Sequence, residues 1–398
     1  MPITTTAFTL AQKLRTGELK ITQALDACYA AIEAGGQANF AALCREQAYA
    51  RAAEIQARLD AGDVRSPLAG VPVAVDDLIC TKGIATCAGS KALEGFVPPY
   101  DAAVIEKINA ADMILIGKTR VSEFGMTNAV DGAAAAIAAG EAPIALGSDT
   151  GGALRRSAAR HGLFALRPTY GAVSRFGLVA YVSSMDQIGP IARSAADCAA
   201  LFAIIKGKDE RDSMSADAPK APLACEGGQR QRFAEALTQG GVLAQGRVLP
   251  MPNLDYALPA FEVLAAAEAS SNLARFDGIK YGHASEKAKN LRESYVLSRS
   301  EGFGPEAKRS VLLGNLVLSA GQYEQYYVQA MRARRLVRQA LLEALATCDA
   351  LSACAEDPSS LVTPSLAGLP ALALPDGTQR IGRAFGEAAL LAAGDYKM

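Results

Sequence analysis

The sequence predicts an α/β fold, and three observations lead to that prediction. A helix-like segment, Ala102–Ala111, lies between two short apolar runs, Val71–Val75 and Met113–Ile116, each typical of a buried strand. A third apolar run, Ile144–Leu146, ends in a glycine-rich turn that leads into another helix-like segment at Ala153. Strands that alternate with helices form parallel pairs joined by crossover helices, so the first three segments are expected to form one βαβ unit.

The other elements of the N-terminal half are mostly helical. Residues 5–62 carry Arg and Glu at helical spacing within alanine-rich stretches, which favours helices there. Asp101 is expected to cap the helix that follows it. The small-residue run Gly132–Ala139 predicts a short helix, and Ser194–Lys206 predicts a capped one.

The C-terminal half is expected to be helical until close to its end. Residues 206–217 are charged and turn-rich, which indicates a surface connection. Residues 256–351 are predicted to be almost wholly helical, with a long amphipathic helix over Gln322–Ala346. A last strand at Ala371–Leu374 and a last helix at Arg383–Ala393 complete the predicted elements.

The amino-acid composition restricts the classes of function that this chain can have. Half of the 398 residues are hydrophobic, so the chain can bury a sizeable core, and its formal net charge of −1 argues against general affinity for nucleic acid or anionic membranes. Met1–Lys20 is polar and mixed, and no apolar run is long enough to span a membrane, so a cytoplasmic protein is expected. The eight Cys are expected to be free thiols, and the only two histidines, His161 and His283, make a zinc site improbable. No cofactor is expected.

The stretch Gly147–Gly152 joins the third strand to the helix that follows it. A glycine-rich turn at a helix start leaves several backbone N–H groups directed at one point, where a phosphate, a carboxylate or a developing oxyanion can bind. Such turns are more often purely structural, so the surrounding residues decide its meaning.

The residues of this turn and those around it resemble the motifs of a known protein family. The turn reads D-T-G-G-A-L-R-R-S-A (Asp149–Ala158) and resembles D-T-G-G-S-I-R-Q-P-A of the amidase signature family, most closely its branch of glutamyl-tRNA(Gln) amidotransferase A subunits. Further blocks include G-V-P-V-A-V-D-D-L-I-C-T-K-G (Gly70–Gly83) and E-A-S-S-N-L-A-R-F-D-G (Glu268–Gly278). The resemblance covers most of the chain. It implies one domain over 1–398, with N-terminal helices in 1–65, and a large mixed, mostly parallel sheet covered by helices on both faces.

The amidases of this family use a lysine, a bridging serine and a nucleophilic serine, and all three are missing here. Asp76 stands at the lysine position, and Ala153 stands at the nucleophile position. The serine-rich loop that carries the bridging serine is deleted, because Asn128 leads almost directly into the Gly132–Ala139 helix. The chain is therefore interpreted as a degenerate homologue, a pseudoenzyme that acts as a binding or scaffold protein.

The remaining site residues are carried over from the resemblance. The backbone of Thr150, Gly151 and Gly152 matches the family's oxyanion-binding turn, and Arg155 is expected to form a structural ion pair with Asp149. We expect Arg156, which is new at its position, to contact the buried Asp76, with Arg155 as the alternative partner. The full set of candidate substrate-binding residues is Thr150, Gly151, Gly152, Arg155, Arg156, Tyr281 and Arg334.

One alternative keeps the chain an enzyme. A residual amidase or glutamine amidohydrolase could use other groups of the remodelled pocket, such as Cys80 or Cys87 with His161, although a buried structural thiol is the simpler interpretation of these cysteines. Partners follow from the resemblance: the B and C subunits of an amidotransferase, or a second copy of the chain, with no direct binding of nucleic acid or membrane.

Overall fold

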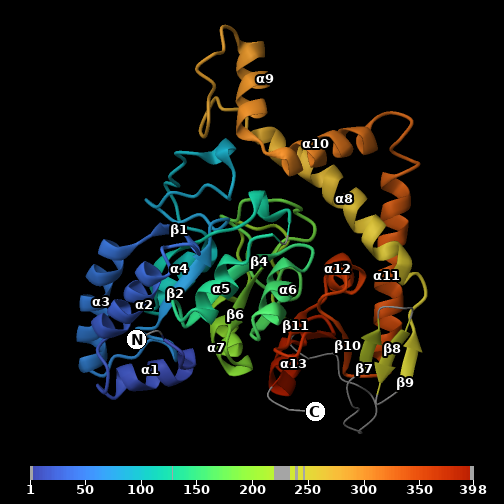
Figure 1. Ribbon diagram of the computed structural model, residues 1–398. Coiled ribbons are helices and arrows are strands. Elements are labelled where there is room, and N and C mark those ends of the chain that lie inside the picture. The colour runs from blue at the N-terminus through green and yellow to red at the C-terminus, as the bar shows by residue number, and fades with distance from the viewer. Residues whose placement is uncertain (1–2, 128, 219–233, 238–240, 245–246, 395–398) are drawn as a thin grey trace.

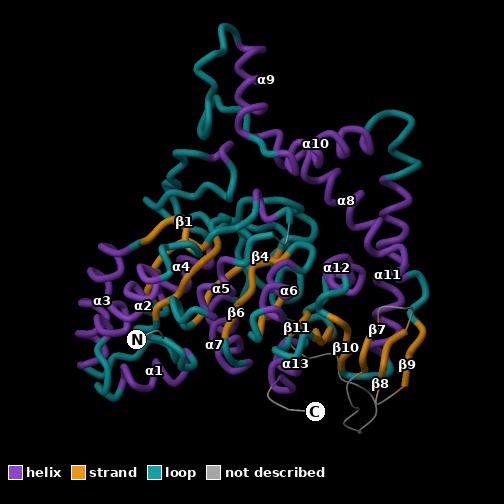
Figure 2. Tube along the Cα trace, viewed as in Figure 1, coloured by secondary structure: helices purple, strands orange, loops and turns teal. Residues whose placement is uncertain are grey.

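The computed structural model describes residues 3–127, 129–218, 234–237, 241–244 and 247–394. A single mixed sheet crosses the molecule, and helices surround it (Figure 1, Figure 2). The strands of this sheet are β1 (Phe40–Leu43), β2 (Pro72–Asp76), β3 (Ile114–Thr119), β4 (Ile144–Asp149), β5 (Phe164–Arg167), β6 (Gln187–Ala192), β7 (Ala234–Leu237), β8 (Gly241–Ala244), β9 (Arg247–Pro250), β10 (Ala350–Cys354), β11 (Ala371–Ala373) and β12 (Thr378–Gly382).

The predicted βαβ unit is confirmed. β2 pairs with β3 in parallel, and the helix α4 (Ala103–Ala110) connects them. The cap at the start of α4 was predicted wrongly: the N-cap is Ala102, and the Asp101 carboxylate instead accepts a hydrogen bond from the backbone N–H of Lys82 at 2.7 Å. The helix therefore begins one residue later, and Asp101 ties its start to the loop after β2.

The prediction of a mostly parallel sheet is wrong. The described strands lie in the order β1-β3-β2-β4-β6-β5-β11-β12-β10-β7-β8-β9, and only β2–β3, β2–β4 and β7–β10 pair in parallel. The pairs that follow β4 in this order are antiparallel until β10. No crossover helix joins β5 to β6, and without a crossover the chain returns in the opposite direction.

Helices cover both faces of the sheet, as expected. Every residue of β2 and β6 is buried, so neither face of these central strands reaches solvent. The main core cluster joins the N-terminal helices to the central strands, and a second cluster joins the C-terminal helices to β10 and β11. The helices up to α7 are α1 (Ala7–Arg15), α2 (Ile21–Ala34), α3 (Arg45–Asp60), α4 (Ala103–Ala110), α5 (Gly132–Ala138), α6 (Ala153–Arg160) and α7 (Ala195–Ile205).

The C-terminal helices form an arm beside the sheet. Figure 1 shows α8 and α10 running away from α11, with α9 extending beyond the rest of the molecule. The predicted helical region is interrupted by turns, and it ends in a strand, β10, that was not predicted. The remaining helices are α8 (Ala257–Asn272), α9 (Leu291–Gly302), α10 (Pro305–Leu318), α11 (Tyr327–Ala346), α12 (Pro358–Ala367) and α13 (Glu387–Gly394). Within the described ranges, no helix combines the length and the apolar character needed to cross a bilayer.

Candidate functional site

The glycine-rich turn lies between β4 and α6, as predicted. Gly152 has a φ of 100°, a left-handed conformation that favours glycine, and its N–H donates to Asp149 Oδ1 at 3.2 Å. A Cβ atom on Gly151 would lie 2.6 Å from Cζ of Phe261 on α8, and one on Gly152 would lie 2.8 Å from Cδ2 of Leu361 on α12. The side chains of two other helices therefore pack directly against the turn.

Beneath the turn lies a fully buried ionic cluster around Asp149. Its carboxylate accepts from Arg155 Nε at 3.0 Å and from Arg167 Nη1 at 3.0 Å. The predicted Asp149–Arg155 pair is confirmed. Arg155 also donates to Gln379 and to the carbonyl of Leu361, and it is fully buried, so it holds the turn in place and does not line the cavity described below.

The side chain of Thr150 also stabilises the conformation of the turn. Its hydroxyl donates to Asp186 Oδ1 at 2.6 Å, and the same carboxylate accepts from the backbone N–H groups of Tyr181 and Val182. This network fixes the loop before β6 to the turn after β4. Thr150 therefore has a structural role for its hydroxyl, separate from any role of its backbone.

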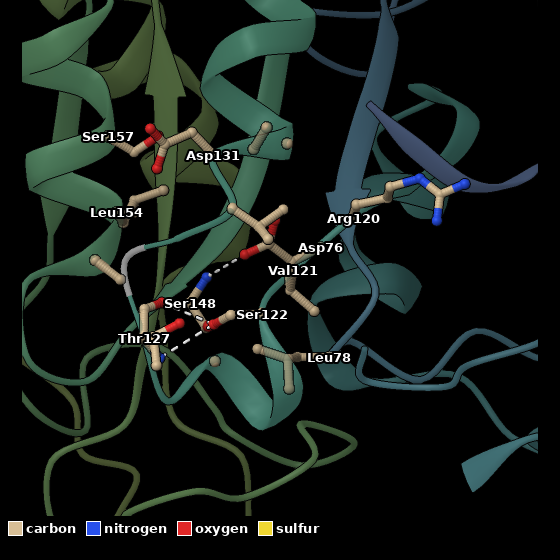
Figure 3. A pocket seen from close by; sticks show the side chains of 15 residues that line it. Asp76, Leu78, Arg120, Val121, Ser122, Thr127, Asp131, Ser148, Leu154 and Ser157 are labelled. Carbon is tan, nitrogen blue, oxygen red and sulfur yellow. Dashed lines mark hydrogen bonds between the residues drawn. The ribbon is translucent and has the colours of Figure 1, made fainter. Parts of the chain in front are cut away.

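Asp76 at the end of β2 and Ala153 at the start of α6 line one small cavity. Figure 3 shows this cavity between the end of β2 and the start of α6. Its volume is about 40 Å³, and its lining residues are Asp76, Leu78, Arg120, Val121, Ser122, Gly125, Thr127, Val130, Asp131, Gly132, Ala133, Ser148, Ala153, Leu154 and Ser157. Ligand pockets for small organic molecules usually have roughly 300–1,000 Å³, so this one has no room for glutamine. Asn128, where the loop deletion was inferred, lies outside the described residues.

The Asp76 carboxylate is buried but hydrogen-bonded. Thr119 Oγ1 donates to its Oδ1 at 2.8 Å, and the backbone N–H of Ser148 donates to its Oδ2 at 2.9 Å. Burial raises the pKa of Asp76 to about 6, although these two hydrogen bonds oppose the shift. The buried Lys118 on β3 pairs with the neighbouring carboxylate, its Nζ 3.6 Å from Asp77 Oδ1.

The predicted contact between Asp76 and Arg156 is wrong. Arg156 Nε donates to Glu356 Oε2 at 3.1 Å, and Arg160 one turn later donates to the same carboxylate. Arg156 therefore extends from α6 toward the loop after β10, where a carboxylate is available near the surface. Asp76 needs no arginine because two uncharged donors already satisfy it.

Neither Tyr281 nor Arg334 lines the cavity. The Tyr281 ring packs 5.3 Å from the ring of Phe96, and its side chain is 37% exposed. Arg334 on α11 donates to the carbonyl of Leu366 at 2.9 Å and to the hydroxyl of Ser184 at 2.8 Å. The structure therefore gives both residues packing contacts, and it does not bring them together with Asp76 and Ala153.

Comparison with known proteins places this geometry in a family. A model of the family described as Amidase matches residues 23–130, 131–239 and 228–365. The A subunit of the glutamyl-tRNA(Gln) amidotransferase of Desulforamulus reducens is 38% identical over 462 residues, which cover 97% of this chain and 95% of that protein. The same subunit of Lachnoclostridium phytofermentans is 37% identical and covers 96% and 94% of the two chains.

The chain belongs to the amidase family.

Solved structures agree with this assignment. The corresponding amidotransferase subunit from Thermotoga maritima is 26% identical, with a TM-score of 0.67 over 96% of this chain and 94% of that one. A protein from a vestigial complex, described for the evolutionary origins of an s-triazine catabolic enzyme, reaches a TM-score of 0.81 at 24% identity, over 98% and 97% of the two chains. The second likeness concerns the fold alone.

The cysteines of this amidase-family chain have the environment of structural thiols. Burial raises the pKa of both Cys80 and Cys87, which disfavours the thiolate that a nucleophile needs. His161 Nδ1 lies 3.0 Å from the carbonyl oxygen of Ser157. Among the described residues, no hydrogen bond joins either cysteine to this histidine.

Several residues of the site were not predicted from the sequence. Asp131 and Ser157 line the cavity, whereas Phe261 and Leu361 pack on the turn. Ser157 could have been singled out from the sequence, because it differs from the proline that stands at its position in the family turn. No sequence feature pointed to Phe261 or Leu361, since the sequence of a distant helix does not indicate which turn its side chains will contact.

Proposed function

We propose that this amidase-family chain is a catalytically inactive relative of amidotransferase A subunits that acts as a binding or scaffold protein. One observation supports this most directly: Ala153 and Asp76 line the same cavity. An alanine methyl has no atom that can attack a carbonyl. A carboxylate at the lysine position carries the opposite charge, and Asp76 has both of its oxygens hydrogen-bonded.

The small volume of the cavity supports the same proposal. At about 40 Å³, it cannot hold an amide substrate together with an attacking group. Phe261 and Leu361 pack against the glycines whose backbone would hold an oxyanion. The Gly152 N–H is already directed at Asp149, which leaves one donor fewer for such a charge.

We expect no release of ammonia from glutamine, asparagine or simple amides above the buffer background. Ala153→Ser alone should remain inactive, because no base is placed to activate the new hydroxyl; loss of the catalytic members of a triad costs orders of magnitude in rate. A coupled ammonia assay measures this, with an active amidase of the same family for the positive control. A burst of ammonia from the wild-type chain or from Ala153→Ser would favour the residual-amidase alternative.

A scaffold needs a partner, and we propose the other subunits of a glutamyl-tRNA(Gln) amidotransferase, since the curated relatives are named for the A subunit of that enzyme. On the helical arm, Leu312 and Leu316 are 72% and 54% exposed, which leaves apolar surface for an interface. We also propose that the chain is cytoplasmic and that it does not contact tRNA directly.

Co-expression with B and C subunits from the same cell, followed by purification and measurement of the solution mass, tests the partner. We expect a stable complex that Leu312→Asp with Leu316→Asp disrupts without unfolding the chain. A complex that is indifferent to this double change would move the interface elsewhere. A homodimer without B or C would replace the proposed partner with a second copy.

A further inference from the structure

A groove between α8 and α11 has the size of a ligand-binding site. It lies where the short helical turn Leu254–Tyr256 and the start of α8 pack beside α11, on the arm in Figure 1. Its volume is about 360 Å³, within the range of roughly 300–1,000 Å³ that is usual for pockets that bind small organic molecules. None of its lining residues also lines the small cavity beside Asp76. The groove is therefore a separate site, with room for a ligand that the small cavity excludes.

The walls of the groove are apolar because each helix turns one face toward it. The apolar lining residues recur three or four positions apart, as they do on one face of a helix: Tyr256, Pro259, Ala260 and Val263 on the α8 side, and Tyr326, Ala330 and Ala333 on the α11 side. Ala260 and Ala330 are 4% and 6% exposed, so they form the floor, whereas Tyr256 and Tyr326 are 56% and 41% exposed at the rim. Small residues at the floor and large ones at the rim leave a hollow that the described chain does not fill.

Arg332 is the only charged residue in the lining of this groove. Its Nη1 donates to Gln329 Oε1 at 3.4 Å, a long hydrogen bond to an uncharged partner one turn earlier. No carboxylate of the described residues forms an ion pair with Arg332. Residues 327–342 of α11 carry four arginines and no Asp or Glu, and two of them, Arg334 and Arg338, donate to backbone carbonyls. The apolar groove therefore has one positive charge at its side that no described side chain neutralises.

We propose that this groove binds a small aromatic monoanion, an aryl carboxylate or sulfonate. The aromatic body of the ligand covers the apolar walls, and Tyr256 and Tyr326 at the rim supply aromatic contacts in addition to the burial of apolar area. The acid group lies against Arg332, because a planar guanidinium can donate two parallel hydrogen bonds to one carboxylate or sulfonate. The side-chain amides of Gln325 and Gln329, which also line the groove, supply further donors.

The same lining disfavours other classes of ligand. A cation would find an arginine and no carboxylate among the lining residues. A nucleotide or another polyphosphate would bring several negative charges to a single guanidinium. A neutral aromatic molecule would gain the apolar contacts, but it would leave Arg332 without an anionic partner. The groove therefore favours one negative charge on a compact apolar body.

Fluorescence titration of the full chain with anilinonaphthalene sulfonate, an aromatic sulfonate whose emission rises in apolar surroundings, tests the proposal. We expect saturable binding of one molecule per chain. Phenylnaphthylamine, the same ring system without the sulfonate, should bind at least tenfold more weakly. Naphthoate, an aromatic carboxylate, should displace the sulfonate, whereas the uncharged naphthalenemethanol at the same concentration should not.

Arg332→Gln removes the charge and keeps the apolar walls, so it should weaken binding of the sulfonate at least tenfold and leave binding of phenylnaphthylamine unchanged. Arg332 is exposed, so this variant is expected to fold. Arg292→Gln, the same change at an exposed position on α9, should leave the binding of both probes unchanged.

Ala333→Phe provides a second variant, since it fills part of the groove without a change of charge; it should weaken binding of both probes at least tenfold. Far-UV circular dichroism checks that each variant is folded. The proposal is overturned by the absence of saturable binding, by equal binding of the two probes to the wild type, or by sulfonate binding that survives Arg332→Gln. These results are independent of the ammonia assay and of the co-expression experiment, so failure here would not decide whether the chain is inactive or which partner it binds.

Discussion

Asp149→Ala is expected to destabilise the protein by about 3–5 kcal/mol, the usual cost of removing one partner from a buried ion pair. Asp149 is the carboxylate between two fully buried guanidinium groups, those of Arg155 and Arg167. Burial raises the pKa of Asp149, but the two arginines outweigh burial and hold it below its usual value. Without this carboxylate, two buried positive charges face each other, and the Gly152 N–H also loses its acceptor.

Urea denaturation at pH 7 measures this change. Asp63→Ala is the matched control, because Asp63 is exposed, and its loss should change the free energy of unfolding by less than about 0.5 kcal/mol. If Asp149→Ala does not fold, Arg155→Met, which leaves a single arginine facing the carboxylate, should still show a loss of several kcal/mol. A loss below about 1 kcal/mol in either variant would contradict the structural role of the cluster.

Asp76→Asn is expected to stabilise the protein at high pH, by up to about 3 kcal/mol at pH 8. The pKa of Asp76 is raised to about 6 by burial, above its usual value near 4. Its contribution to stability is therefore fully present below about pH 4 and is lost as the pH rises through 6. Asparagine can keep both hydrogen bonds, since its oxygen accepts from Ser148 and its amide donates to Thr119.

The difference between Asp76→Asn and the wild type should shrink toward zero as the pH falls from 8 to 4. Urea denaturation at several pH values measures this difference, with Asp63→Asn as the exposed control. A difference that stays constant with pH would mean that Asp76 does not titrate in this range. Loss of stability at every pH would mean that the two hydrogen bonds depend on the carboxylate itself.

The local elements of the core were predictable from the sequence. The runs that form β2, β3 and β4 are short and apolar, and the helices α4 and α5 between them have helical composition, so hydrophobic pattern and turn chemistry are enough to place them. The glycine-rich turn was predictable for the same reason. The proposed loss of the triad also rests on local sequence, because Asp76 and Ala153 can be compared position by position with the family motif.

Several strands were not predictable in this way. β10 and β12 are short. β10 pairs with β12 and with β7, which lies far earlier in the chain. Their local sequence gives no indication of that pairing, and β10 follows directly on the strongly helical pattern of α11. The direction of each strand depends on its connection, so the prediction of a mostly parallel sheet failed at the antiparallel pairs on both sides of β5.

The sequence by itself therefore determined the family and the α/β class, because both follow from which residue stands at which position. Only the tertiary structure decided where the charges lie. It placed Arg156 against Glu356 instead of Asp76, and it placed Phe261 and Leu361 on the turn. It also placed Asp76 and Ala153 on the wall of one small cavity. Ion pairs and cavities depend on side chains from distant segments, and their distances exist only once the helices have packed on the sheet.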